Sequence, residues 1–189
     1  MQPVQSKLYN EFIPNNEIQQ FEKDIESKKY KHWVDKYSKH LVGIFGAFMF
    51  FSGYDVDVND VTYFKSKGVN LNLPSNAYPS NSGNTTPLCS ACEYRNMALI
   101  KALVSNGANI IQEDPNGFTP LEFVMIGHCQ EDTYDAIECE NFVTTLVELG
   151  ATKTIRKDII ENSCQEYKKK SAYLSKFFTE VFLREPAPK

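Results

Sequence analysis

The chain has 189 residues, of which 42% are hydrophobic and 23% are charged, and its formal net charge is −4. This composition is typical of a globular protein and excludes a collagen-like or a largely disordered chain. Residues 42–155 carry five Lys or Arg against thirteen acids, whereas residues 156–189 carry eight basic and five acidic groups. Because an acidic middle repels phosphate backbones, we expect no nucleic-acid binding.

The first predicted elements form a helical cap over residues 1–41. Ile18, Phe21 and Ile25 recur at helical spacing, with Asn15 or Asn16 available as the N-cap. A second helical pattern follows in Trp33, Val34, Tyr37 and Leu41. The first ten residues lack the basic start and apolar run of a secretory signal. We therefore expect a cytoplasmic protein, and the five cysteines, an odd number, predict free thiols rather than a disulfide framework.

The apolar run Leu41–Phe51 is about half as long as a membrane-spanning helix. It contains Gly43 and Gly46, and lysines precede it. These features predict a buried core helix and no membrane span.

A short motif recurs after this run. Thr86-Pro87-Leu88 and Thr119-Pro120-Leu121 begin two similar segments, and the distance between their threonines defines a period. Thr caps a helix by accepting a backbone N–H bond, and Pro fits the first helical position. Each motif therefore predicts the start of a helix.

Three glycines predict the ends of the partner helices. Gly68, Gly107 and Gly150 each follow apolar residues at helical spacing and precede a small or β-branched residue. Glycine in this place is a helix C-terminal stop. Two antiparallel helices per unit, closed by glycine, form a solenoid repeat.

The chain resembles the ankyrin repeat family. Residues 117–124 and 98–109 are similar to the family's G-x-T-P-L-x-x-A, its apolar second helix and its G-A-x-x-N segment, and residues 67–72 look like the end of an earlier repeat. The resemblance covers about residues 44–155. It implies an all-α, ankyrin-type helical solenoid of about three repeats over residues 42–155, with short β-hairpin fingers. Helical caps would flank it at residues 1–41 and 156–189.

Two departures from the period predict insertions. The interval from Gly68 to Gly107 exceeds the interval from Thr86 to Thr119 by six positions. The surplus is expected in the Pro-, Ser- and Asn-rich segment 73–84, an enlarged finger with Tyr78 at its tip. The interval from Gly107 to Gly150 exceeds the period by ten positions, which places a second insertion between the helices of the third repeat, at 128–139.

The C-terminal segment is expected to close the stack. Apolar residues at 159–167 and 173–181 predict two capping helices, followed by a short tail. Such caps are needed because a stack of repeats leaves an apolar face open at each end.

Cysteine and histidine offer one alternative function. Cys89, Cys92, His128 and Cys129 could bind zinc tetrahedrally, or a Cys–His pair could act as a nucleophile and base. The alignment, however, places Cys89 and Cys92 inside the first helix of a repeat, where buried cysteine behaves as a small hydrophobe. We therefore predict no metal, no cofactor, no catalytic residue and no enzyme. A thiol- or zinc-dependent enzyme is the least favoured alternative.

The ankyrin resemblance implies binding of another protein through the fingers and the concave helical face. Phe123 and Ile126 align with Ser90 and Glu93, which would face that groove, so they either contact a partner or are buried under the insertion. Aromatic side chains supply anchors with few rotatable bonds. The predicted partner-binding residues are Tyr78, Asn81, Glu93, Tyr94, Asn116, Phe118, Phe123 and Ile126.

The second insertion bears on the kind of partner. Its acids, Glu131, Asp132, Asp135, Glu138 and Glu140, could steer a partner with a basic surface or simply keep a loop soluble. An alternative function follows from composition: divergent ankyrin chains rich in Lys, Asn, Ile and Phe resemble effectors that bacteria deliver into a host cytoplasm, or regulators of such effectors. The sequence leaves the partner's identity and the oligomeric state open.

Overall fold

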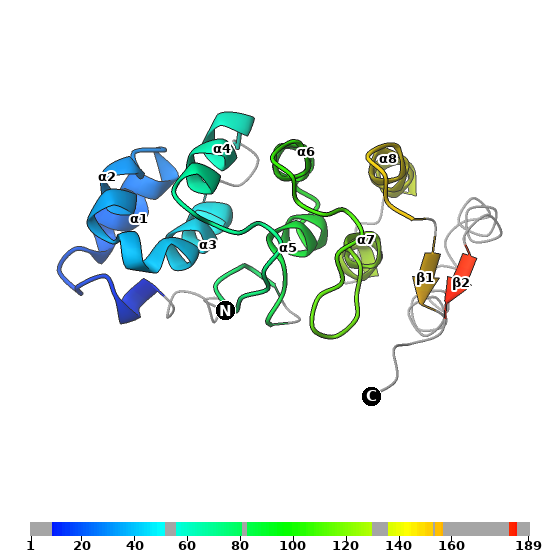
Figure 1. The fold of residues 1–189 in the computed structure, drawn as a ribbon, viewed down its shortest axis with the longest axis horizontal. Coiled ribbons are helices and arrows are strands. Elements are labelled where there is room, and N and C mark those ends of the chain that lie inside the picture. The colour runs from blue at the N-terminus through cyan, green and yellow to red at the C-terminus, as the bar shows by residue number, and fades with distance from the viewer. Residues whose placement is uncertain are drawn as a thin grey trace.

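The computed structural model describes residues 9–51, 56–80, 83–129, 136–152, 154–156 and 182–184. The chain is mainly helical, as predicted. Figure 1 shows α3, α5 and α7 side by side in one row and α4, α6 and α8 in a second row above it in this view. The elements are η2 (Tyr9–Glu11), α1 (Ile18–Glu26), α2 (Lys31–Lys36), η3 (Ser38–His40), α3 (Leu41–Phe51), α4 (Val58–Ser66), α5 (Pro87–Glu93), α6 (Met97–Ser105), α7 (Pro120–Cys129), α8 (Ala136–Glu148), β1 (Thr154–Arg156) and β2 (Phe182–Arg184).

The N-terminal elements form an aromatic cluster against α3. The Phe21 and Trp33 rings meet edge to face at 5.3 Å, and both side chains are buried. The N-cap of α1 is Glu17, without a capping side chain, so the prediction of Asn15 or Asn16 was wrong. The second predicted helix is divided, because Tyr37 leaves helical geometry (φ −115°, ψ 44°) between α2 and η3.

The core helix α3 lies where the apolar run predicts it. Ile44 through Met49 are buried along it, and Gly46 meets the backbone of Ala77. A Cβ atom at Gly46 would lie 2.7 Å from the carbonyl carbon of Ala77 and nearer still to its oxygen, so only glycine permits this approach. In the described part of the chain, no helix is long and apolar enough to cross a membrane.

The two Thr-Pro-Leu motifs begin their helices in the same way. Thr86 Oγ1 accepts the Cys89 N–H at 3.1 Å, and Thr119 Oγ1 accepts the Glu122 N–H at 3.4 Å. Both threonines are buried, and each precedes a proline that begins its helix, α5 or α7. The prediction of two helix starts is confirmed.

The closing glycines also repeat one geometry. At the end of α6, Gly107 adopts a φ of +89°, its N–H donates to Val104 O, and the Ala108 N–H donates to Leu103 O at 2.9 Å. This paired pattern is the Schellman motif, which requires a left-handed residue and so favours glycine. The same bonds recur around Gly68, after α4, and Gly150, after α8.

The six extra residues of the first insertion can now be placed. Ser75 N donates to Thr85 O at 2.8 Å, and Asp114 N donates to Phe118 O at 2.9 Å in the next unit. Ser75 and Asp114 each lie seven residues after the closing glycine. Nine residues separate Ser75 from Thr85, but only three separate Asp114 from Phe118. The surplus therefore lies between Ser75 and Thr85, inside the predicted segment.

The second insertion is not mainly the longer connection between two helices that the sequence predicted. α7 has 10 residues where α5 has 7, and α8 has 13 where α6 has 9, so seven of the ten extra residues lengthen helices. α5 stops early because Arg95 turns left-handed (φ 55°) and Asn96 caps α6 through its side chain. His128 and Cys129 belong to α7, and Cys139 belongs to α8.

A small sheet was not predicted. β1 pairs in parallel with β2, with Ile155 opposite Leu183. β1 follows the closing glycine of α8, Gly150. The predicted capping helices at 159–167 and 173–181 lie outside the described residues.

Candidate functional site

The segment that was predicted to be an enlarged finger does not present Tyr78 to solvent. Residues 76–80, here called the strap, fold back between α3 and α5. Tyr78 is only 1% exposed, and its ring meets Phe45 edge to face at 5.9 Å. The prediction of Tyr78 as a partner-binding anchor at the finger tip is therefore wrong, because the ring fills the core beside α3. Burial also raises the pKa of its phenol.

The strap covers the face of α5 that was expected to line an open groove. Ser90 Oγ donates to the carbonyl oxygen of Pro79, and Ser80 Oγ donates to Glu93 Oε2 at 2.6 Å. Ser90 is 1% exposed and Glu93 is 5% exposed. Glu93 was a predicted partner-binding residue; its carboxylate instead holds the strap in place.

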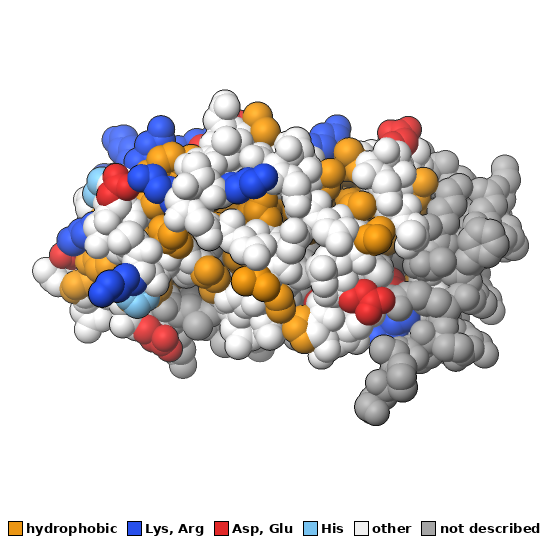
Figure 2. All heavy atoms as spheres, viewed as in Figure 1, with side chains coloured by type: hydrophobic (Ala, Val, Ile, Leu, Met, Phe, Trp, Pro, Cys, Tyr) orange, Lys and Arg blue, Asp and Glu red, His pale blue; other side chains and the backbone are white. Residues whose placement is uncertain are grey.

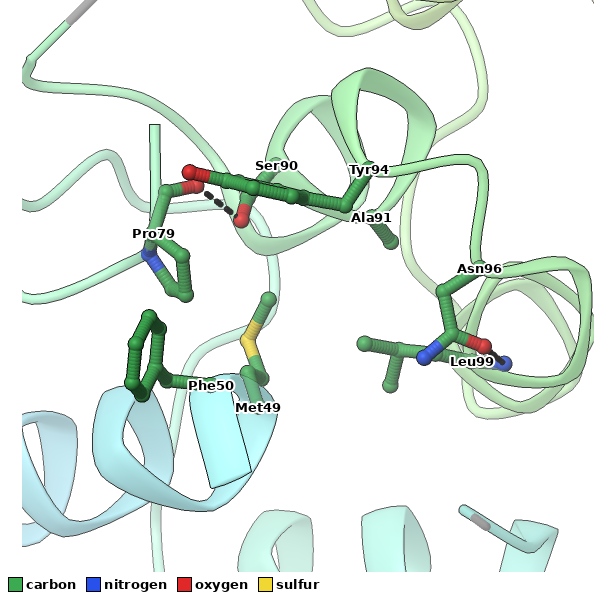
Figure 3. Close-up of a pocket in the computed structure, with 8 residues that line it drawn as sticks. All are labelled: Met49, Phe50, Pro79, Ser90, Ala91, Tyr94, Asn96 and Leu99. Atoms are coloured by element: carbon green, nitrogen blue, oxygen red, sulfur yellow. Dashed lines mark hydrogen bonds between the residues drawn. The ribbon is translucent and has the colours of Figure 1, made fainter. Parts of the chain in front are cut away.

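Where the strap ends, an apolar groove of about 220 Å³ remains. Figure 3 shows Met49 and Phe50 on α3 facing the strap and α5, with Pro79 and Tyr94 beside them. The full lining consists of Met49, Phe50, Pro79, Ser90, Ala91, Tyr94, Asn96 and Leu99. Its rings are accessible, since Phe50 is 37% exposed and Tyr94 is 45% exposed.

The Ser90 and Asn96 side chains of this groove are engaged by the protein itself. The Ser90 hydroxyl donates to the strap, and Asn96 Oδ1 accepts the Leu99 N–H at 3.0 Å. Burial and the neighbouring Glu93 raise the pKa of Tyr94, so its phenol is neutral at physiological pH. The groove therefore offers aromatic and aliphatic surface and suits an apolar group.

A second group of predicted residues lies around the turn from Asp114 to Phe118. The guanidinium carbon of Arg156 lies 4.2 Å from the centre of the Phe118 ring, and Arg156 Nη1 donates to Asn116 O at 3.0 Å. Phe118 is thus half-buried beneath an arginine from β1. Phe123 packs against it at 5.9 Å and is fully buried. Phe123 is therefore buried rather than exposed to a partner, but its ring contact is with Phe118, and the side chains of the 128–139 insertion lie outside the described residues.

The C-x-x-C pair is also in the core. Cys89 and Cys92 are both fully buried. Burial raises the pKa of Cys89 to about 12 and that of Cys92 well above its ordinary value, so neither thiol ionises readily. A nucleophile or a zinc ligand acts as the thiolate, and burial of this kind makes that form costly. Across the described residues, no three His, Cys, Asp or Glu side chains form a group that could hold a metal ion.

The structure brings together only part of the predicted set. Tyr94 borders the groove, whereas Asn116 and Phe118 both contact Arg156 at the turn from Asp114 to Phe118. Asn81 and the side chain of Ile126 lie outside the described residues. The sequence analysis did not predict Phe50 and Pro79 as site residues. Two signals could have indicated them: the six-residue surplus, which falls in the segment with Pro79, and the glycines of the apolar run that contains Phe50.

Comparison with known proteins gives no match: neither a protein-family model nor a curated protein sequence corresponds to this chain.

Proposed function

We propose that this chain is a non-catalytic, ankyrin-type repeat protein that binds another protein, and that the groove beside the strap receives an apolar side chain of that partner. The equivalent caps at Thr86 and Thr119 and the equivalent closures at Gly68, Gly107 and Gly150 support the repeat assignment. In such proteins the function lies in the surface that the repeats display.

The observation that carries the proposal is the exposure of Phe50 and Tyr94 on either side of a groove with two engaged polar side chains. Aromatic side chains around a small pocket are typical binding hot spots. A volume of about 220 Å³ is sufficient for one leucine or aromatic side chain.

Selection of a displayed random-peptide library against the intact protein tests this function. We expect enriched peptides to share one large apolar residue. Tyr94→Ala and Phe50→Ala should each weaken the affinity of these peptides about tenfold, because truncation at a hot spot removes more than about 1 kcal/mol.

The matched control is Val42→Ala. Val42 lies on the same helix as Phe50 and has nearly the same exposure, 38%. It should leave the affinity unchanged. Equal affinities of the parent, Phe50→Ala and Tyr94→Ala proteins, with unchanged unfolding transitions, would exclude the groove as the binding site.

A further inference from the structure

A basic surface lies on the N-terminal elements and shares no residue with the groove. Residues 28–40 contain five lysines and a single acid, Asp35. Lys29, Lys31, Lys36 and Lys39 are exposed, and Lys67 is exposed at the end of α4. Figure 2 shows Lys and Arg side chains gathered at upper left, over α2 and α4.

In two places on these elements, one carboxylate is contacted by both a lysine ammonium group and a tyrosine hydroxyl. Glu17 Oε2 accepts from Lys36 Nζ at 2.5 Å and from the Tyr37 hydroxyl at 3.1 Å. The bond from Lys36 is the main cause that lowers the pKa of Glu17.

The second carboxylate with a lysine and a tyrosine is more buried than the first. Asp60 Oδ1 accepts from the Tyr30 hydroxyl at 2.5 Å, and its other oxygen lies 3.3 Å from Lys28 Nζ. An ammonium group and a phenol thus form a recurring carboxylate-binding arrangement in this part of the chain.

A third set of the same residue types is only partly used. Lys31 Nζ lies 5.2 Å and Lys67 Nζ 5.3 Å from the centre of the Tyr63 ring. Lys67 pairs with Asp35 at 2.7 Å, and the Tyr63 hydroxyl lies 3.5 Å from the Lys31 carbonyl oxygen, to which it donates. Lys31 is exposed and forms no ion pair with any residue that the structure describes.

We infer that the surface formed by Lys31, Tyr63 and Lys67 binds an acidic, Asp- or Glu-rich segment of a protein. The first two sets show that this residue combination suits carboxylates. A lipid surface fits less well, because the large aromatic residue of α2, Trp33, is 4% exposed and cannot insert. An extended nucleic acid would also meet the acidic remainder of a chain with a net charge of −4.

Fluorescence anisotropy with a labelled deca-glutamate peptide and the full chain tests this inference. The peptide should bind at low ionic strength and dissociate as salt is added, because exposed charges are screened. Lys31→Glu replaces an attraction with a repulsion and should lower the affinity about tenfold.

Lys101→Glu is the matched control. It makes the same charge change at an exposed lysine on α6 and should leave the affinity within about twofold of the parent value. Tyr94→Ala should likewise have no effect, which separates this surface from the groove. The inference would be overturned if deca-glutamate does not bind, or if Lys101→Glu lowers its affinity as much as Lys31→Glu does. Tighter binding of decathymidylate or of phosphatidylserine-containing vesicles than of deca-glutamate would also overturn it.

Discussion

Replacing Tyr78 with alanine should destabilise the protein rather than weaken binding selectively. The ring is 1% exposed and packs against Phe45, so its removal leaves a cavity between α3 and the strap. A buried tyrosine removes about 150 Å² of apolar surface from water. At about 25 cal/mol per Å², this burial contributes about 4 kcal/mol, which agrees with the losses measured for large-to-alanine core substitutions.

Urea denaturation followed by circular dichroism measures the effect directly. A loss of about 4 kcal/mol is a large part of the stability of a typical domain, and for a chain of this size it lowers the melting temperature by about 8–16 °C. Tyr94→Ala is the control, because a ring that is 45% exposed contributes less to the core. A Tyr78→Ala protein within about 1 kcal/mol of the parent would show that the strap is not anchored by this ring.

Three further substitutions or treatments test the packing. Gly46→Ala drives a Cβ atom into the carbonyl group of Ala77 and should cost about 3 kcal/mol, measured by urea denaturation. Glu122→Ala leaves the Thr119 and Arg156 N–H groups without their acceptor and should cost about 2–3 kcal/mol, whereas Glu122→Gln, which keeps an oxygen, should cost less. Cys89 and Cys92 should resist iodoacetamide at pH 8 in the native protein and react in urea, as peptide mapping would reveal, because burial raises the pKa of Cys89 to about 12.

The parts of the fold that could be predicted are those fixed by local hydrogen bonds. Thr86 and Thr119 cap their helices within three residues, and Gly107 closes α6 within five. Such bonds depend on residue type at fixed spacing, so the sequence contains the information. The repeat period is then the number of residues from one capping threonine to the next.

The path of the strap could not be predicted in the same way. A segment rich in Pro, Ser and Asn predicts a loop, but it does not specify the surface on which the loop packs. That surface is decided by Phe45 and Gly46, which belong to α3 and are separated from Tyr78 by the whole of α4. The pairing of β1 with β2 could not be predicted for the same reason, because the paired residues Ile155 and Leu183 are also far apart in the chain.

The strap also limits which part of α5 is open to a partner under the proposed function. Because it satisfies Ser90 and Glu93, the middle of α5 becomes part of the core and cannot meet a partner without first losing these bonds. Beside the strap, accessible apolar surface remains in the groove between Phe50 and Tyr94. The same segment therefore stabilises the fold through Tyr78 and shapes the groove through Pro79. Under the proposed function, a strap variant that lowers the affinity for a partner should lower stability as well, whereas substitution of the exposed Phe50 or Tyr94 ring tests binding with less effect on the core.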